Sequence, residues 1–387
     1  MIQEKIHLIK KSIDNKIRNE NKIGLLDGKS GAILFYLHYY KIFNDTDSYN
    51  KASDLIEEIY NGLDFKNFNS NFCSGISGFF WLLEFIEGKK IMDDSFDDLL
   101  YDIDDLIIDR LDIFCNHNNH DFLYGSLGVG YYLNSRLNTT GFSKEKYLNA
   151  IENHVNNLLE SSINNDQTIK WISNTFKNEP KIDIYLSLPH GFLGIYSILS
   201  KYGENKLLLQ KLSLKITLKK AYNYLLQDFQ NLNIKRNSIY PLFESIPNSS
   251  TRLAWCNGDL SVVITLLNMH NLLHEDNDIL NTIVKISETT SKRKDINDTQ
   301  INDIYLCHGS LGLVNIYESL YNKTKNDSFK EAKDYWLSYS IKKIEENPSV
   351  LNDCDISLLT GLTGVGLTLL SEMDTSLRDW KNCILIN

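Results

Sequence analysis

The fold of this chain is decided by one short segment, Tyr305-Leu306-Cys307-His308-Gly309-Ser310-Leu311-Gly312, because six other segments resemble it. Six of the seven segments have a glycine that is followed three places later by a second glycine. In the fifth segment, Ser261 replaces the second glycine. The first glycines are residues 28, 75, 125, 191, 258, 309 and 361, at successive intervals of 47, 50, 66, 67, 51 and 52 residues. One such segment is a weak signal, but seven similar segments at this spacing predict a repeat architecture.

Helices are predicted on both sides of each glycine pair. The runs that follow it, such as Ala32 to Leu37 and Val262 to Leu267, are apolar on every side, which is typical of buried helices. Between them lie amphipathic stretches in which apolar residues recur at steps of three and four. These stretches cover residues 4–17, 49–63, 95–114, 145–161, 206–227, 278–292 and 328–346. The pattern predicts seven inner helices alternating with seven outer ones.

A closed ring buries such helices without special end repeats. An open solenoid normally needs atypical polar caps, and the first and seventh repeats look like the others. We therefore expect an all-α fold, an α/α toroid made of a double barrel of seven inner and seven outer helices. We expect it to span residues 1–387 as a single domain. The longer third and fourth intervals predict extra loops near 164–180 and 236–250.

Composition limits the classes of function. With 42% hydrophobic residues the 387-residue chain can bury a large core, and a formal charge of −10 argues against a nucleic-acid surface. The sequence contains no signal-peptide pattern and no apolar stretch long enough for a transmembrane segment. Six cysteines spread over a long chain fit a reduced, cytoplasmic setting.

Two cysteines occupy equivalent places in neighbouring repeats. Cys256 and Cys307 each lie two residues before the first glycine, and His308 follows Cys307. In a ring these side chains would meet, and two thiolates with an imidazole predict a Zn²⁺ site with a free fourth position. The alternative is that they are buried cysteines and a core histidine. Cys73 shares the register but lies farther round the ring, so we interpret it as a core residue.

These motifs resemble the lanthionine synthetase C-like family, the zinc-dependent lanthipeptide cyclases and their relatives. The resemblance covers essentially the whole chain, and its most specific parts are Trp255-Cys256-x-Gly258, Cys307-His308-Gly309 and His190-Gly191. It implies an α/α toroid that closes thioether rings in a dehydrated precursor peptide, as in lantibiotic biosynthesis. Two departures stand out: Asn257 replaces a residue that is usually aromatic or histidine, and Ser261 replaces the second glycine.

The resemblance also implies site residues. The family's zinc ligands correspond to Cys256, Cys307 and His308, and its catalytic residues correspond to His190, Asp121 and Arg252. A peptide thiol held as a thiolate would add to dehydroalanine or dehydrobutyrine, with Arg252 stabilising the enolate and His190 moving a proton. Asp121 would orient His190. Asp121 could instead be a helix cap, and Arg252 a surface cation.

The resemblance points to a stand-alone cyclase, whose dehydrated substrate is supplied by a separate dehydratase. A peptide transporter is an expected assembly partner, which would bring a cytoplasmic enzyme to the membrane periphery. Alternatives are a relative that adds glutathione to dehydroamino acids in proteins, and a zinc-stabilised peptide-binding scaffold without catalysis. A prenyltransferase-type barrel is disfavoured because its zinc ligands include an aspartate.

Overall fold

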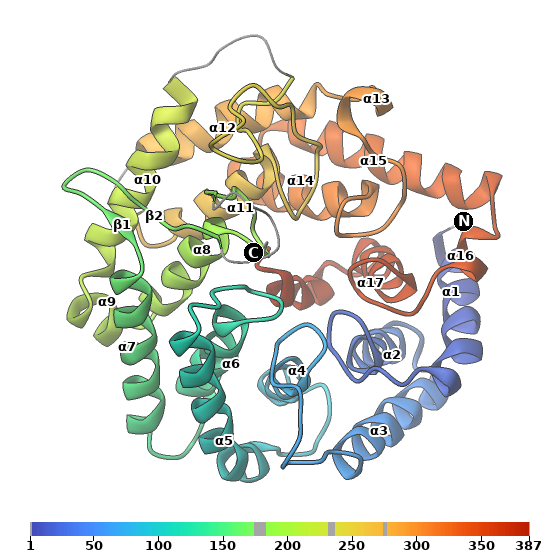
Figure 1. Ribbon diagram of the computed structural model, residues 1–387. Coiled ribbons are helices and arrows are strands. Elements are labelled where there is room, and N and C mark those ends of the chain that lie inside the picture. Colours follow the sequence, from blue (N-terminus) through green and yellow to red (C-terminus); the bar gives the residue numbers. More distant parts are fainter. Residues whose placement is uncertain (1, 174–182, 231–236, 274–276, 387) are drawn as a thin grey trace.

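A computed structural model describes residues 2–173, 183–230, 237–273 and 277–386, and these residues form two concentric layers of helices (Figure 1). The inner layer consists of α2 (Lys29–Phe43), α4 (Ile76–Gly88), α6 (Ser126–Thr139), α8 (Phe192–Gly203), α11 (Asp259–His270), α14 (Ser310–Thr324) and α17 (Leu362–Met373). The outer layer consists of α1 (Ile2–Lys16), α3 (Thr46–Asn61), α5 (Asp97–Asn116), α7 (Glu145–Glu160), α10 (Leu214–Gln230), α12 (Asn277–Ser291) and α15 (Asp327–Glu346). The predicted α/α toroid is confirmed in the described part of the chain.

Every inner helix begins directly after the first glycine of its repeat. In the sixth repeat, the N–H of Ser310 donates to the carbonyl oxygen of Asp303, six residues before Gly309, at 3.1 Å. In the second repeat, the N–H of Ile76 bonds the corresponding carbonyl at 2.9 Å. This turn satisfies an N–H group that would otherwise lack a helical partner. It also holds the residue six places before the glycine at a defined place beside the start of the helix.

The second glycine of each pair lies against the carbonyl oxygen of the residue six places before it, where a side chain would not fit. A Cβ on Gly312 would lie 2.1 Å from the carbonyl oxygen of Leu306, and the other second glycines meet an equivalent carbonyl. Ser261 solves the same problem differently, because its hydroxyl donates to the carbonyl of Trp255 at 2.7 Å. The preceding Gly258 has φ 81° and ψ −165°, whereas the first glycines of the other repeats have negative φ. The fifth repeat therefore departs from the pattern in both sequence and backbone.

Main-chain hydrogen bonds join each repeat to the next and close the ring. The acceptor in each bond is the carbonyl of the residue two places before the first glycine of the following repeat. The donor is the N–H of the residue two or three places before the first glycine of its own repeat. The seven bonds are Leu26 to Cys73, Cys73 to Leu123, Phe122 to Pro189, Leu188 to Cys256, Trp255 to Cys307, Leu306 to Leu359 and Leu358 to Leu26, at 2.9–3.1 Å. This ring of bonds aligns the glycine loops at one end of the barrel.

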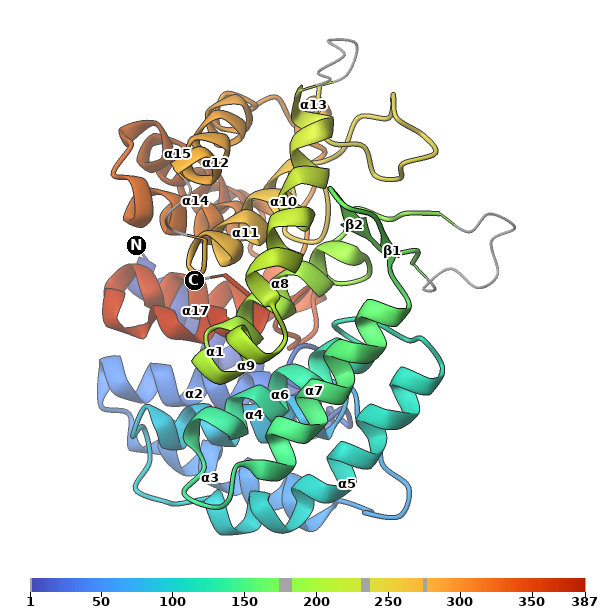
Figure 2. The same cartoon turned by 90° about the vertical axis from the view of Figure 1, so that its left-hand side faces the viewer.

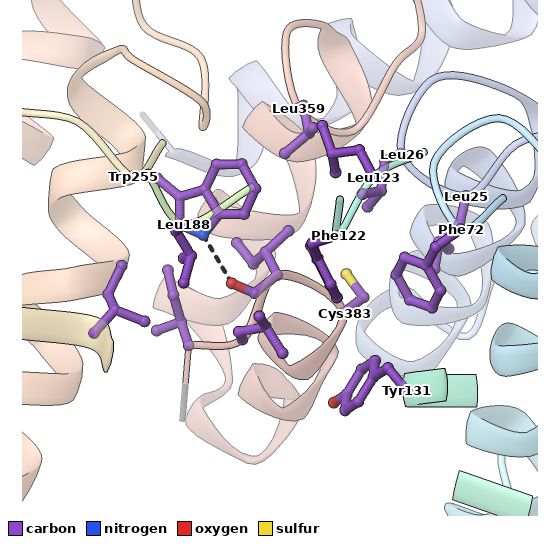
Figure 3. Close-up of a cluster of buried hydrophobic side chains, with 14 of the residues drawn as sticks. Leu25, Leu26, Phe72, Phe122, Leu123, Tyr131, Leu188, Trp255, Leu359 and Cys383 are labelled. Atoms are coloured by element: carbon purple, nitrogen blue, oxygen red, sulfur yellow. Dashed lines mark hydrogen bonds between the residues drawn. The ribbon is translucent and has the colours of Figure 1, made fainter. Parts of the chain in front are cut away.

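The two ends of the described chain complete the packing. Helix α1 packs against α17, so the first outer helix covers the last inner one (Figure 1). The segment η2 (Thr375–Ile384) continues into the middle of the ring, where Cys383 is buried with Leu123, Phe122 and Trp255 (Figure 3). The indole N–H of Trp255 donates to the carbonyl of Ile384 at 2.8 Å. The C-terminal segment thus supports the loop that carries Cys256.

The outer layer differs from the prediction at one place. The stretch predicted as one helix over 206–227 consists of α9 (Lys206–Lys211) and α10, because Ser213 between them has φ 51°. The shorter elements are η1 (Ile17–Asn19), α13 (Ile296–Thr299) and α16 (Val350–Asp353). None of the helices in the described ranges has the length and hydropathy needed to cross a membrane.

The predicted extra loops lie on one side of the ring (Figure 2). The first contains a hairpin of β1 (Ile163–Asn164) and β2 (Ile169–Lys170), and its residues 174–180 lie outside the described residues. The second is described from residue 237 onward. The segment that follows the first loop pairs with the second loop, since the N–H of Leu186 donates to the carbonyl of Leu242 at 3.0 Å. Lys170 also forms an ion pair with Glu244 at 2.7 Å.

Candidate active site

The thiols of Cys256 and Cys307 meet at the glycine-loop end of the ring. The N–H of Cys256 donates to the carbonyl of Cys307 at 3.3 Å, and the two side chains are also hydrogen-bonded. All six cysteines of the chain are free, including Cys73, whose thiol donates to the phenol of Tyr124 at 3.8 Å. The shared register of Cys256 and Cys307 therefore brings them together.

The two thiols do not ionise alike. The hydrogen bond from Cys307 lowers the pKa of the Cys256 thiol to about 7, assisted by the positive charges of His308, Arg252 and His190. The hydrogen bond to Cys256, with burial, raises the pKa of Cys307 well above its ordinary value. When Cys256 is a thiolate, the S–H of Cys307 stabilises it. The negative charge on Cys256 then opposes ionisation of Cys307. In the metal-free pair, the Cys256 thiol therefore ionises before the Cys307 thiol.

Asp121 makes two kinds of contact with its two carboxylate oxygens. Its Oδ1 accepts hydrogen bonds from the N–H groups of Leu123 and Tyr124, each at 2.8 Å. Its Oδ2 lies 2.7 Å from Nδ1 of His190. Asp121 is therefore not the cap of α6, whose N-cap is Gly125; its Oδ1 holds the preceding turn and its Oδ2 contacts His190. A carboxylate that accepts from Nδ1–H leaves Nε2 as the nitrogen able to exchange a proton.

The imidazole of His190 is held on several sides. Burial lowers its pKa, but the hydrogen bond and negative charge of Asp121 outweigh burial and the net pKa is raised. The ring of Tyr124 is nearly parallel to it, with centroids 6.1 Å apart. A small cavity of about 20 Å³ lies beside His190 and is also lined by His120 and Trp171. His190 therefore borders a small cavity while its Nδ1 is held by Asp121.

Arg252 lies near both sulfurs. Its positive charge lowers the pKa of both Cys256 and Cys307, which requires the guanidinium to lie close to the thiol pair. Its carbonyl oxygen would be 2.6 Å from a Cβ on Gly258, so the turn at the glycine holds the backbone of Arg252 tightly. A cation near the sulfurs can stabilise negative charge that develops on a nearby carbonyl oxygen.

His308 is turned towards a carboxylate. Its Nδ1 lies 2.8 Å from Oδ2 of Asp303, and this hydrogen bond raises the pKa of the imidazole. Among the residues that the structure describes, no three His, Cys, Asp or Glu side chains are grouped closely enough to hold a metal ion. The predicted ligands Cys256 and Cys307 are thus paired, while His308 lies near them without completing the group.

The donor set nevertheless suits zinc in its chemistry. Cys256 and Cys307 already present two sulfurs to one place, and the charge of His308 acts on Cys256. Thiolate and imidazole are the ligand types that zinc prefers, and three of them leave one coordination position for substrate. Nδ1 of His308 is occupied by Asp303, so Nε2 is the nitrogen that would bind a metal.

Two residues beside the thiols were not identified from sequence, although the repeat alignment contains the signal. Tyr185, Arg252 and Asp303 each lie six positions before the first glycine, in the fourth, fifth and sixth repeats. The pKa of the buried Tyr185 phenol is raised by burial and by the negative charges of Cys256 and Cys307, so it borders the same site. Extending the register from two to six positions before the glycine would have found both Tyr185 and Asp303.

The two departures from the motif both affect the loop of Cys256. The amide of Asn257 donates to the sulfur of Cys256 at 3.5 Å, so it contacts a predicted ligand directly. The hydroxyl of Ser261 donates to the carbonyl of Trp255, the residue before Cys256, and so holds this part of the loop in place. Neither departure removes a sulfur from the site.

Comparisons with known proteins identify the family and the fold. The family model described as "Lanthionine synthetase C-like protein" matches residues 19–385. Among solved structures, one titled "Nisin cyclase" superposes with a TM-score of 0.74 and 19% sequence identity, covering 100% of this chain and 96% of that chain. A search of curated proteins finds no match.

Proposed function

The chain belongs to the lanthionine synthetase C-like family, and from this premise we propose that it is a zinc-dependent lanthipeptide cyclase. Its reaction is the intramolecular addition of cysteine thiols to dehydroalanine or dehydrobutyrine in a dehydrated precursor peptide. The products are lanthionine and methyllanthionine thioether rings. One observation carries the proposal: the sulfur of Cys256, which is paired with that of Cys307, lies within electrostatic reach of His190, whose Nδ1 is 2.7 Å from Asp121.

Cys256, Cys307 and His308 would hold the zinc ion, whose remaining position accepts the substrate. Bound zinc would lower the pKa of the peptide thiol so that it attacks as a thiolate. A free cysteine has a pKa of about 8.5, so little thiolate exists at neutral pH without such help. Asn257 adds a hydrogen-bond donor beside Cys256.

The remaining site residues serve the addition itself. A carbon–sulfur bond forms at the β-carbon, the carbon–carbon double bond is lost, and the electrons move to the carbonyl as an enolate. Arg252 stabilises that negative charge. His190 exchanges the proton through Nε2, taking it from the thiol or delivering it to the α-carbon. No group leaves and nothing is oxidised, so the reaction needs no further reactant.

The proposal implies a biochemical setting. A separate dehydratase must act first, because the acceptor is a dehydrated serine or threonine residue. We expect the enzyme to work in the cytoplasm, as one domain over residues 1–387, in a complex that can include a peptide transporter. The substrate is a peptide, so the segments that pair through Leu186 and Leu242 are expected to border its path.

A peptide with one dehydroalanine and one cysteine tests the function. Ring closure leaves the peptide mass unchanged and removes the free thiol, so iodoacetamide labelling followed by mass spectrometry reports it. We expect zinc-loaded protein to remove the thiol much faster than buffer alone, and the His190→Ala variant to retain zinc but lose rate. Glutathione is added in a parallel reaction. A glutathione adduct without a ring would support the glutathione-transferring relative, and zinc binding without either product would support a scaffold.

A further inference from the structure

Asp303 uses its two oxygens as Asp121 does. Its Oδ1 accepts the N–H of Tyr305 at 2.9 Å, which fixes the turn before the inner helix. Its Oδ2 lies 2.8 Å from Nδ1 of His308. The carbonyl of Asp303 also accepts the N–H of Ser310, so both its main chain and its side chain are held. The imidazole of His308 is therefore oriented by a residue that has little freedom to move.

The seventh repeat contains the same aspartate without an imidazole. Asp355 lies six positions before Gly361, as Asp303 lies six positions before Gly309. Its Oδ1 accepts the N–H of Ser357 at 2.9 Å, which reproduces the turn. Thr360 takes the place that corresponds to His308. The turn thus requires only one oxygen of the aspartate, and the contact with His308 is an additional feature of the sixth repeat.

An ionised carboxylate can only accept a hydrogen bond, so Nδ1 of His308 must carry the proton. In the neutral imidazole, Nε2 then keeps its lone pair. Histidines that bind metals commonly donate their other N–H to a carboxylate, which fixes the tautomer and the ring orientation. We propose that Asp303 is a positioning residue for zinc, which holds His308 in the tautomer that binds the metal through Nε2. This inference rests on the zinc-dependent function proposed above.

Replacing Asp303 by asparagine separates the two roles. The amide oxygen of the new side chain can still accept the N–H of Tyr305, so the turn is retained. The amide nitrogen then faces Nδ1 of His308 and donates to it, which places the proton on Nε2 and blocks metal binding. The matched control is Asp355→Asn, which makes the same chemical change in the same turn without an imidazole.

Zinc affinity is measured on metal-depleted protein by competition with a chromophoric chelator. We expect Asp303→Asn to weaken zinc binding about 10–100-fold and Asp355→Asn to change it less than about twofold. The tautomer of His308 is read from ¹⁵N chemical shifts of histidine-labelled protein without metal, assigned with a His308→Gln variant. We expect Nδ1–H in the wild type and Nε2–H in Asp303→Asn.

Unchanged affinity in Asp303→Asn, or equal losses in both variants, would overturn the role of Asp303 and leave the cyclase proposal standing. Wild-type protein that binds no stoichiometric zinc would instead remove the proposed function itself. Thermal unfolding of each variant shows whether it is folded. If Asp303→Asn is unfolded, the ¹⁵N measurement on the wild type still tests the inference. A wild-type His308 that carries its proton on Nε2 would contradict it.

Discussion

Cys256 and Cys307 are joined by both their main chains and their side chains. The N–H of Cys256 donates to the carbonyl of Cys307 at 3.3 Å, and the thiol of Cys307 donates to the sulfur of Cys256. The first contact shares its acceptor, the carbonyl of Cys307, with the bond from Trp255 in the ring of hydrogen bonds that closes the toroid. The bonds that stabilise the fold therefore also determine the position of the paired sulfurs.

Removing either sulfur should abolish stoichiometric zinc binding and cyclisation. We expect this of Cys256→Ala and Cys307→Ala, because each removes one of three proposed ligands. Cys73→Ala is the matched control, since Cys73 occupies the same register but bonds Tyr124. Metal content after dialysis measures the effect. One equivalent of zinc retained by Cys307→Ala, or lost from Cys73→Ala, would contradict the assignment.

Asp121→Asn should lower the pKa of His190 and slow cyclisation. The asparagine oxygen can still accept from Leu123 and Tyr124, so the turn remains, but the negative charge that raises the histidine pKa is lost. Loss of general acid–base function costs roughly 10²–10⁴-fold in rate. The pKa is measured by NMR titration of metal-depleted protein. An unchanged pKa would show that Asp121 acts only on the turn before α6.

The Asp121–His190 pair should also make stability depend on pH. The folded-state pKa of His190 is raised, so its contribution is fully present below about pH 6.5, the unfolded value. That contribution is lost as the pH rises through the folded pKa. Urea unfolding of metal-depleted wild type and His190→Gln should therefore differ most at acidic pH and less at alkaline pH. A difference that grows with pH would have the wrong sign.

Arg252→Gln should raise the pKa of the Cys256 thiol. The arginine charge helps to lower that pKa to about 7, after the larger effect of the hydrogen bond from Cys307. The pH dependence of Cys256 alkylation in metal-depleted protein measures the change, and the midpoint should move upward. Lys22→Gln is the control, because Lys22 has the same register in the first repeat and lies 3.9 Å from Asp27. Equal midpoints in wild type and Arg252→Gln would place the guanidinium elsewhere.

The sequence predicted the ring and the thiol pair because both follow from register. Equivalent positions in a closed repeat meet at the same end, so Cys256 and Cys307 could be paired from their spacing alone. The contact between Asp303 and His308 could not be predicted in this way, because it depends on side-chain torsions within one loop. The break at Ser213 was missed for a similar reason: the apolar pattern continues through a residue whose φ is 51°.

The turn at Gly258 provides the last prediction. Its φ of 81° and ψ of −165° lie in a region that almost only glycine adopts, and a Cβ would lie 2.6 Å from the carbonyl of Arg252. We expect Gly258→Ala to cost about 1–3 kcal/mol in the free energy of unfolding, measured with urea. Zinc affinity should fall as well, because the strained turn directly follows Cys256 and Asn257.

Gly88→Ala is the control for this substitution, since a Cβ at Gly88 would meet no atom within 4 Å. Gly88 ends α4, away from the glycine loops, and should tolerate alanine with little change in stability or metal binding. If Gly258→Ala were as stable as Gly88→Ala, the positive φ would not be required by the fold. If it were destabilised but bound zinc normally, the turn would support the barrel without orienting Cys256.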